Sequence, residues 1–202
     1  MENNKEYQGY LEEVKTYGTT IHFVPENMRT AELCKIAVNK WGGNLEYVPE
    51  ELKSPELCES AVENGGWALQ YVPDEMKTQQ LCELAVSNYG LGLQYVPEEL
   101  ITKELCEVAV SNSGWALQYV PEELKSLELC SIAIEKSGDT LQFVPTEFRT
   151  MELCEIAVST FRDDYFSSEE ESAALIRNFV PEEFREELAE EFGIELDEQF
   201  YR

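Results

Sequence analysis

The chain has 202 residues, of which 41 are acidic and 15 are basic, so that its net charge is −26. This charge excludes direct binding to nucleic acid or to anionic membranes. It favours a basic partner, or it serves only to keep an extended surface soluble. Hydrophobic residues make up 43% of the chain, which excludes wholesale disorder, and the length suffices for one domain with its own core.

No part of the sequence predicts a membrane segment. Residues 1–6 contain no apolar signal region, and no apolar run approaches the ~20 residues that a membrane-spanning helix needs. We therefore expect a cytoplasmic protein that does not bind a membrane; export by a route that leaves no simple N-terminal mark is the alternative.

A 24-residue period runs through most of the chain. Val-Pro recurs with this spacing, at Pro25, Pro49, Pro73, Pro97, Pro121 and Pro145. A cysteine follows nine residues after each proline, at Cys34, Cys58, Cys82, Cys106, Cys130 and Cys154. A fixed period of this length indicates a solenoid, in which each unit buries its apolar face against its neighbours.

The repeat that begins at Pro49 shows how one unit should fold. Ser54 can cap a helix, and Pro55 suits the first turn of that helix. Apolar residues at i, i+1, i+4 and i+5 then form one helical face, namely Leu57, Cys58, Ala61 and Val62. Gly65 and Gly66 should end the helix, because glycine accepts the left-handed conformation found at helix C-termini.

The second half of the unit, residues 67–72, is too short for a long helix. Because Pro73 disfavours helix at the residue before it, we expect a short α- or 3₁₀-helix that stops at Val72, with another turn started by the proline. A strand is the alternative, since Leu-Gln-Tyr-Val alternates apolar and polar residues. The Pro-Glu-Glu-Leu that follows such segments argues against a strand.

The six cysteines are predicted to be buried thiols rather than disulfides or metal ligands. Each occupies the same position of its repeat, so that neighbouring cysteines should lie one helix spacing of roughly 8–10 Å apart. A disulfide needs Cα atoms within about 7 Å. With no Cys-x-x-Cys pair and with His22 as the single histidine, zinc binding is also disfavoured, and we expect no metal and no cofactor.

The consensus Leu-Gln-Tyr-Val-Pro-Glu-Glu-Leu, followed by Leu-Cys-Glu-x-Ala-Val, resembles a repeat family known only as a domain of unknown function, found in protist, bacterial and large-virus proteins. The period and the long-plus-short helix pattern also resemble leucine-rich repeat variant proteins, which stack α- and 3₁₀-helices into a right-handed superhelix. Together they imply an all-α fold, a right-handed solenoid of 24-residue units that each hold one α-helix and a shorter α- or 3₁₀-helix. Neither family implies a catalytic residue.

The two ends of the chain depart from the period. We predict one solenoid domain, 1–202, in which residues 1–24 form an N-terminal capping unit, 25–158 the regular repeats and 159–202 an insert and C-terminal capping helices. In the last part, Ser168 begins a capping box and residues 185–192 should continue a helix up to Gly193. The insert contains Phe161, Tyr165 and Phe166, which are a candidate partner-binding loop if they are not part of the cap.

Charged residues also keep the period. An acidic residue follows each of five prolines directly, at Glu26, Glu50, Asp74, Glu98 and Glu122. A basic residue comes three positions later, at Arg29, Lys53, Lys77, Lys125 and Arg149, with Ile101 as the interruption. We expect an acidic row and a basic row on the outside, which partly neutralise each other.

Aromatic residues occupy two further positions. Phe or Tyr precedes each Val-Pro, at Phe23, Tyr47, Tyr71, Tyr95, Tyr119, Phe143 and Phe179, and we interpret this aromatic row as core because it keeps register with the valine. Trp67 and Trp115 share a position that varies between repeats, which suggests a surface or groove and an interface anchor.

No residues combine into a catalytic site. His22 takes a position filled by Glu or Gln in other repeats, which indicates a surface site, and the carboxylates recur in every unit, whereas an enzyme site is singular. We therefore expect a non-catalytic repeat protein that binds another protein, with Trp67, Trp115, Glu50, Asp74, Glu98, Glu122 and the insert aromatics as candidate contacts. The alternative is an acidic inhibitor that imitates nucleic acid and occupies a nuclease or DNA-binding protein.

Overall fold

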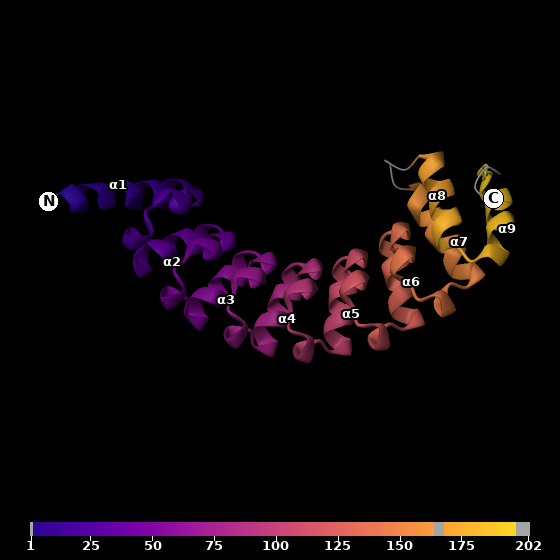
Figure 1. The fold of residues 1–202 in the computed structure, drawn as a ribbon, viewed down its shortest axis with the longest axis horizontal. Helices are drawn as coiled ribbons and strands as arrows, with labels where there is room; N and C mark the ends of the chain where they lie inside the picture. The colour runs from indigo at the N-terminus through magenta and orange to yellow at the C-terminus, as the bar shows by residue number, and fades with distance from the viewer. Residues whose placement is uncertain (1, 164–167, 197–202) are drawn as a thin grey trace. The chain divides into compact units, whose positions relative to one another are not determined.

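The computed structural model describes residues 2–163 and 168–196, with the side chains of residues 2–4, 19, 20 and 163 left aside. The α-helices are α1 Glu2–Tyr17, α2 Ala31–Lys40, α3 Pro55–Asn64, α4 Gln79–Asn88, α5 Lys103–Asn112, α6 Leu127–Lys136, α7 Met151–Asp163, α8 Glu169–Phe179 and α9 Glu182–Phe192 (Figure 1).

Between the α-helices, 3₁₀-helices of two lengths alternate. The longer ones are η1 Thr19–Phe23, η3 Gly42–Tyr47, η5 Gly66–Tyr71, η7 Gly90–Tyr95, η9 Gly114–Tyr119 and η11 Gly138–Phe143. The shorter ones, each directly after a proline, are η2 Glu26–Met28, η4 Glu50–Leu52, η6 Asp74–Met76, η8 Glu98–Leu100, η10 Glu122–Leu124 and η12 Thr146–Phe148. The described residues contain no strand, so the strand alternative was wrong and the all-α fold is confirmed.

Each regular α-helix begins at the predicted cap. The hydroxyls of the capping residues accept a hydrogen bond from the backbone N–H three residues later, as Ser54 does from Leu57 at 3.3 Å. The same bond recurs at Thr30, Thr78, Thr102, Ser126 and Thr150. The predicted apolar face is buried, as in α3, where Leu57, Cys58, Ala61 and Val62 form it.

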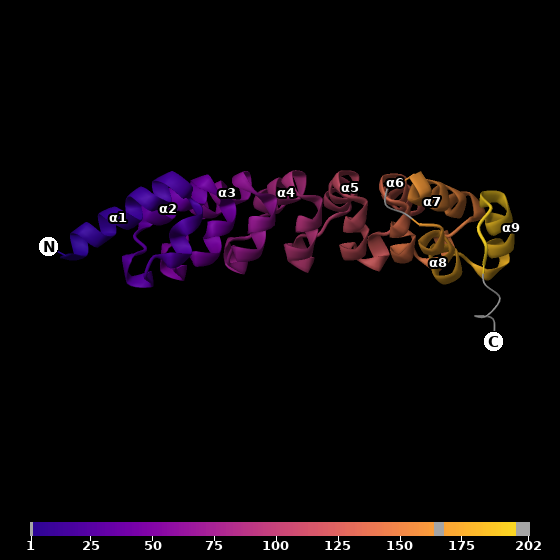
Figure 2. The ribbon, with the colours of Figure 1, turned by 90° about the horizontal axis from the view of Figure 1, so that it is seen from above.

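The chain forms two compact units, Met1–Leu105 and Cys106–Arg202. In the first unit, α2, α3 and α4 lie side by side in chain order, and η3 packs against both α2 and α3, while η5 packs against both α3 and α4 (Figures 1 and 2). In the second unit, η11 contacts α6 and α7 in the same way. Each unit is therefore a helical solenoid with one layer of α-helices and one layer of 3₁₀-helices.

The repeat glycines are required for close packing, not for a left-handed turn. The helix α3 ends at Asn64 with Gly65 as its C-cap, as expected, but within the described residues only Gly18 and Gly193 have a positive φ, so the left-handed conformation expected for Gly65 and Gly66 was wrong. A Cβ on Gly42 would collide with the carbonyl oxygen of Ala61, which belongs to the next repeat's α-helix. Gly66 meets Ala85, Gly114 meets Ala133 and Gly138 meets Ala157 in the same manner. A glycine here lets the 3₁₀ layer touch the neighbouring α-helix backbone.

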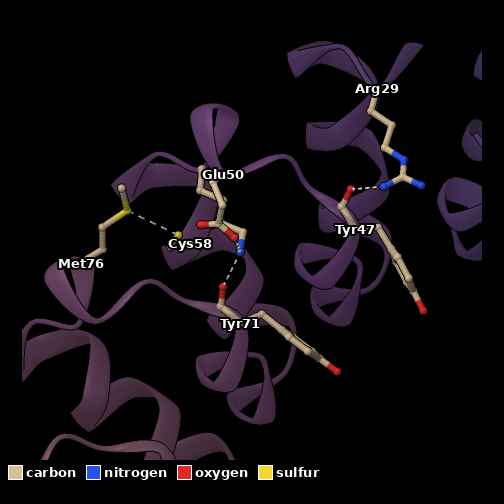
Figure 3. Close-up of polar contacts among 7 residues, drawn as sticks. Arg29, Tyr47, Glu50, Cys58, Tyr71 and Met76 are labelled. Atoms are coloured by element: carbon tan, nitrogen blue, oxygen red, sulfur yellow. Dashed lines mark hydrogen bonds and ion pairs between the residues drawn. The ribbon is translucent and has the colours of Figure 1, made fainter. Parts of the chain in front are cut away.

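The six cysteines are free and completely buried, as the burial prediction required. Burial raises the pKa of Cys34, Cys82, Cys106, Cys130 and Cys154 from 9.0 to about 11, and it also raises the pKa of Cys58. In α3, the Sγ of Cys58 lies 4.0 Å from the Sδ of Met76 in the following repeat (Figure 3). The thiols therefore act as small core side chains that stay protonated at neutral pH.

The C-terminal segment folds as predicted. Ser168 forms a capping box with Glu171 at the start of α8, and α9 ends at Gly193, whose φ of 62° is left-handed. Arg162 of α7 donates to the backbone oxygen of Phe192 at 2.5 Å. Tyr165 and Phe166 lie outside the described residues, so the predicted binding loop is not described beyond Phe161.

No helix in the described part of the chain combines the length and the apolar character that crossing a membrane demands.

Candidate functional site

The basic row was expected on the outside, but its side chains turn inward and bind backbone. Lys53 keeps 7% and Lys125 only 5% of its side chain exposed. Lys53 Nζ donates to the carbonyl oxygen of Tyr71 at 2.9 Å, and Lys125 Nζ donates to that of Phe143 at 3.0 Å. Each acceptor ends the longer 3₁₀-helix that follows the next α-helix, two residues before the proline of the next repeat. We call the Lys or Arg at this position the clamp residue.

Arginine clamp residues bind two repeats at once. Arg29 donates from Nε to the carbonyl of Val24 at 2.9 Å. Its Nη1 donates to the carbonyl of Tyr47, also at 2.9 Å (Figure 3). Arg149 makes the same pair of bonds, to Val144 at 2.8 Å and to Phe179 at 2.7 Å. Tyr47 and Phe179 are the last residues of their helices, and Val24 and Val144 follow a helix directly, so these carbonyls have no helical N–H to pair with. A cationic side chain supplies the donor. The basic row therefore ties the start of a repeat to its end, and its arginines also bind the preceding repeat.

The acidic row stays exposed, as expected, and three of its members pair with a clamp residue. The Nζ–carboxylate distances are 2.6 Å for Lys53–Glu50, 2.8 Å for Lys77–Asp74 and 2.6 Å for Lys125–Glu122. The three acidic side chains keep 74%, 85% and 74% of their surface exposed. At Glu98 the clamp position holds Ile101, which carries no charge. Carboxylates therefore dominate this surface, while the amines lie beneath them.

The aromatic row is not core, contrary to our interpretation. Phe23 is 69% exposed, and the other members are half-buried. A 3₁₀-helix has three residues per turn, so the buried positions recur at i and i+3, as at Leu45 and Val48. Tyr47 precedes the valine by one residue and therefore lies off that face. Figure 3 shows Tyr47 and Tyr71 projecting in the same direction from successive repeats.

Part of this row joins an aromatic cluster in the first unit. The ring centroids of Trp41 and Trp67 lie 5.0 Å apart, and those of Trp67 and Tyr71 lie 6.2 Å apart in an edge-on arrangement. Trp41 is 44% exposed, and Trp67 and Tyr71 are half-buried. Trp67 fits because the preceding repeat has Gly43 at the same position, where a side chain would collide with the indole. We call Trp41, Trp67 and Tyr71 the aromatic surface.

A single carboxylate, Glu46, adjoins this surface. Its negative charge is the main cause that raises the pKa of Tyr47, and a hydrogen bond between the two side chains adds to it. For Tyr71, burial raises the pKa first, and the charge and hydrogen bond of Glu46 raise it further. The charge of Glu46 thus acts on two tyrosines from successive repeats.

Glu46 and Trp41 were missed by the sequence interpretation. Four other repeats carry glutamine at the position of Glu46, and each of these glutamines donates from Nε2 to the carbonyl three residues before it, at 3.0 Å. A carboxylate cannot donate this bond. The signal was therefore present in the sequence as an exception to a repeated glutamine.

The other predicted contacts lie elsewhere. Trp115, in the second unit, is 37% exposed, and its ring packs edge-on against Phe143 at 5.5 Å. Phe161 is half-buried in α7, close to Gly138. The structure brings Trp67 together with Trp41, Tyr71 and Glu46, whereas Trp115 and Phe161 belong to the second unit.

A hollow of ≈310 Å³ lies against α2 and α3, lined by Ala31, Lys35, Leu52, Ser54, Glu56, Leu57 and Ser60. Its titratable groups are Lys35 and Glu56. Hydrogen bonds from the backbone N–H of Glu56 and from the Ser54 hydroxyl lower the pKa of this carboxyl, so it stays ionised. The lining therefore holds no neutral acid or activated nucleophile. Across the described ranges, no group of three or more His, Cys, Asp or Glu side chains could hold a metal ion.

His22 is exposed, as expected, and its ring lies 5.6 Å from that of Tyr47.

Comparison with known proteins agrees with the interpretation of the chain as tandem repeats. No curated protein and no solved structure matches the chain significantly. A family model described as "Domain of unknown function (DUF4116)" matches three windows, residues 30–77, 54–101 and 102–149. Together these windows span residues 30–149, which is more than half of the 202 residues. The chain therefore belongs to the DUF4116 family of tandem repeats.

Proposed function

We propose that this chain is a non-catalytic repeat protein that binds another protein through the aromatic surface of its first unit. The observation that carries the proposal is the exposure of neighbouring rings, with Trp41 44% exposed and packed 5.0 Å from Trp67. Tryptophan is enriched among the residues that dominate interface energies. A solenoid that needed only stability would bury these rings or replace them.

The position of the aromatic surface supports a binding role. Trp67 occupies a position that holds Gly43, Leu91, Trp115 and Asp139 in other repeats, so the fold does not require tryptophan there. The clamp residues and the buried apolar face, by contrast, hold similar residues from repeat to repeat. Variable residues on a regular framework are how repeat proteins build binding surfaces.

An acidic mimic of nucleic acid is the second candidate, and one observation favours it. Because the clamp lysines are buried beneath exposed carboxylates, the surface is more acidic than two alternating rows would be. Residues 163–202 add 14 acidic and three basic residues. Such a surface would suit a nuclease or another DNA-binding protein.

A capture experiment separates the two candidates. The purified full chain, its Trp67→Leu variant and its Trp115→Leu variant are each used to capture proteins from a lysate of the source cells, with washes at low and then high salt. Leucine occupies the same position at Leu91, so both variants should fold. Trp115→Leu is the control, because it removes a tryptophan that belongs to the second unit.

We expect a partner that survives the high-salt wash with the wild-type chain and with Trp115→Leu, but not with Trp67→Leu. A set of DNA-binding proteins that elute with salt from all three chains would favour the mimic instead, because charge-driven binding is screened. A salt-resistant partner captured equally by Trp67→Leu would contradict the aromatic surface as the docking site.

A further inference from the structure

We propose that Trp41, Trp67 and Glu46 form a receptor for one arginine side chain presented by a basic segment of the partner protein. This inference rests on the proposed function, because it names the chemistry that the aromatic surface recognises. We call these three residues the arginine receptor.

The first observation is that Glu46 departs from the repeat and loses a hydrogen bond that the glutamines at this position make. Gln70 donates to the carbonyl of Trp67, and Gln118 donates to that of Trp115, each at 3.0 Å. Glu46 cannot make this bond and leaves its own 3₁₀-helix without it. A residue that gives up a hydrogen bond common to other repeats points to a role outside the fold.

The second step is the geometry of the rings around this carboxylate. Trp41 contacts Trp67, and the indole of Trp67 lies against Gly43, where a Cβ would collide with it. Glu46 follows Gly43 by three residues in η3, and residues three apart lie on the same face of a 3₁₀-helix, so an exposed indole and a carboxylate lie on one continuous surface. Trp41 is the most exposed ring of this set. A cation above an indole face is attracted by the ring electrons, and the adjacent carboxylate adds charge attraction.

The third step is that the negative charge of Glu46 is available. Arg29, whose charge also acts on Tyr47, donates to the carbonyls of Val24 and Tyr47. No ion pair to Glu46 is formed by the residues that the structure describes. An arginine of the partner protein would therefore not have to displace an internal cation from Glu46.

Arginine fits this surface better than lysine. A guanidinium is planar and weakly hydrated, so it can stack on an indole and bind a carboxylate through two parallel N–H groups at once. A lysine ammonium is a compact, strongly hydrated charge that gains less from stacking. The net charge of −26 also favours approach of a basic segment.

Peptide titration of the full chain tests the receptor. The probe is an uncharged glycine–serine peptide with a single central arginine and blocked ends, followed by tryptophan fluorescence, with lysine and citrulline versions of the same peptide alongside. The variants are Glu46→Gln, which inserts the glutamine of the other repeats, and Trp41→Ser, which inserts the residue found at Ser113 and Ser137. Glu75→Gln removes an exposed charge elsewhere in the first unit and is the charge-matched control.

We expect Glu46→Gln and Trp41→Ser each to weaken binding of the arginine peptide about three- to tenfold, and Glu75→Gln to change it less than about twofold. The lysine peptide should bind more weakly, and the citrulline peptide, which keeps the shape without the charge, weakest of all. Equal binding by Glu46→Gln and Glu75→Gln, or equal binding of arginine and citrulline peptides, would overturn the receptor.

The lysate capture then distinguishes this failure from failure of the proposed function. If the partner is lost with Trp67→Leu but fully retained with Glu46→Gln, the aromatic surface is a docking site and the arginine receptor is wrong. If the partner is retained with both variants, the docking surface itself is wrong. Loss of the partner with both variants, but not with Glu75→Gln, supports both.

Discussion

The clamp positions and the aromatic surface obey opposite rules. A clamp residue ties backbone segments together, and apart from Ile101 its position always holds a long cation, as when Arg29 and Lys53 bind corresponding carbonyls. At the two tryptophan positions of the aromatic surface, equivalent residues differ in size and polarity, as Gly43 and Trp67 do. The positions that repeat build the framework, and the positions that do not repeat distinguish one part of its surface from another.

This difference teaches how to divide the residues of a repeat protein between fold and function. Substitutions at repeated positions should lower stability wherever they are made. Substitutions at the aromatic surface should change stability little and binding much. The predictions below test the two halves of that statement, beginning with the largest expected effect.

Raising the pH should unfold the chain through its buried thiols. Because five cysteine pKa values are raised from 9.0 to about 11, these thiols are protonated in both states well below pH 9, but around and above pH 9 the unfolded chain loses protons that the folded chain keeps. The free energy of unfolding should therefore fall steeply between pH 9 and 11, measured by urea denaturation followed by circular dichroism.

A thiol reagent provides the matching control. At pH 8 the native chain should leave all six cysteines unmodified, and the urea-unfolded chain should react at all six. Rapid modification of any cysteine in the native chain would contradict its burial.

Gly42→Ala should lower the free energy of unfolding by about 3 kcal/mol or more, because the added Cβ collides with backbone that cannot move aside alone. Thermal and urea denaturation measure the loss. Gly9→Ala is the matched control: a Cβ there meets nothing, and alanine should stabilise helix α1 by about 0.5–1 kcal/mol. Equal effects of the two substitutions would refute the close-packing argument.

Lys53→Met should lower the free energy of unfolding by about 1–3 kcal/mol, because the carbonyl of Tyr71 then loses its charged donor. Glu50→Gln removes only the exposed partner of the same lysine and should cost about 0–1 kcal/mol. Urea denaturation of both variants at one pH gives the comparison. A larger loss from Glu50→Gln would mean that the surface ion pair, not the bond between repeats, stabilises this position.

Ile101→Lys should give Glu98 an ion pair like that between Lys53 and Glu50. The substitution should raise the free energy of unfolding by up to about 1 kcal/mol. Ile101 is half-buried, and the boundary between the two compact units follows shortly after it, at Leu105. Urea denaturation again provides the measurement. A decrease would show that the apolar contacts of Ile101 outweigh the missing charge.

Glu46→Gln should have the smallest effect on stability, a gain of about 0.5 kcal/mol at most, because the glutamine can donate the bond that other repeats have. The same variant is expected to lose binding. A clear loss of stability would instead assign Glu46 to the framework.

Much of the framework could be predicted from sequence because its signals are local. Ser54 caps its helix and Leu57 is buried, as spacing alone indicated. The reason for the glycines could not be predicted, because the contact between Gly42 and Ala61 joins residues of different repeats. The same limit applies to the clamp residues, because a clamp residue and its acceptor lie 18 residues apart at Arg29 and at Lys53.

At the candidate site, the sequence identified Trp67 but not its neighbours. The aromatic row was assigned to the core because each of its members adjoins a buried valine. In an α-helix or a 3₁₀-helix, however, adjacent residues face different directions, so burial of the valine does not imply burial of its neighbour. Glu46 could have been found by asking which repeat lacks the common glutamine. Its proximity to Tyr71 could not, because that depends on how two repeats stack.

The bond between a clamp residue and the carbonyl at the end of its repeat also bears on how such a chain can change in length during evolution. Donor and acceptor lie 18 residues apart at Arg29 and at Lys53, so tandem duplication of 24 residues copies a donor together with a matching acceptor site. Arg149 keeps its bond to Phe179 across 30 residues, which shows that extra sequence can enter between the partners without breaking the connection. Genes for such proteins can therefore gain or lose whole repeats, and accept insertions between them, while each new junction inherits a working connection.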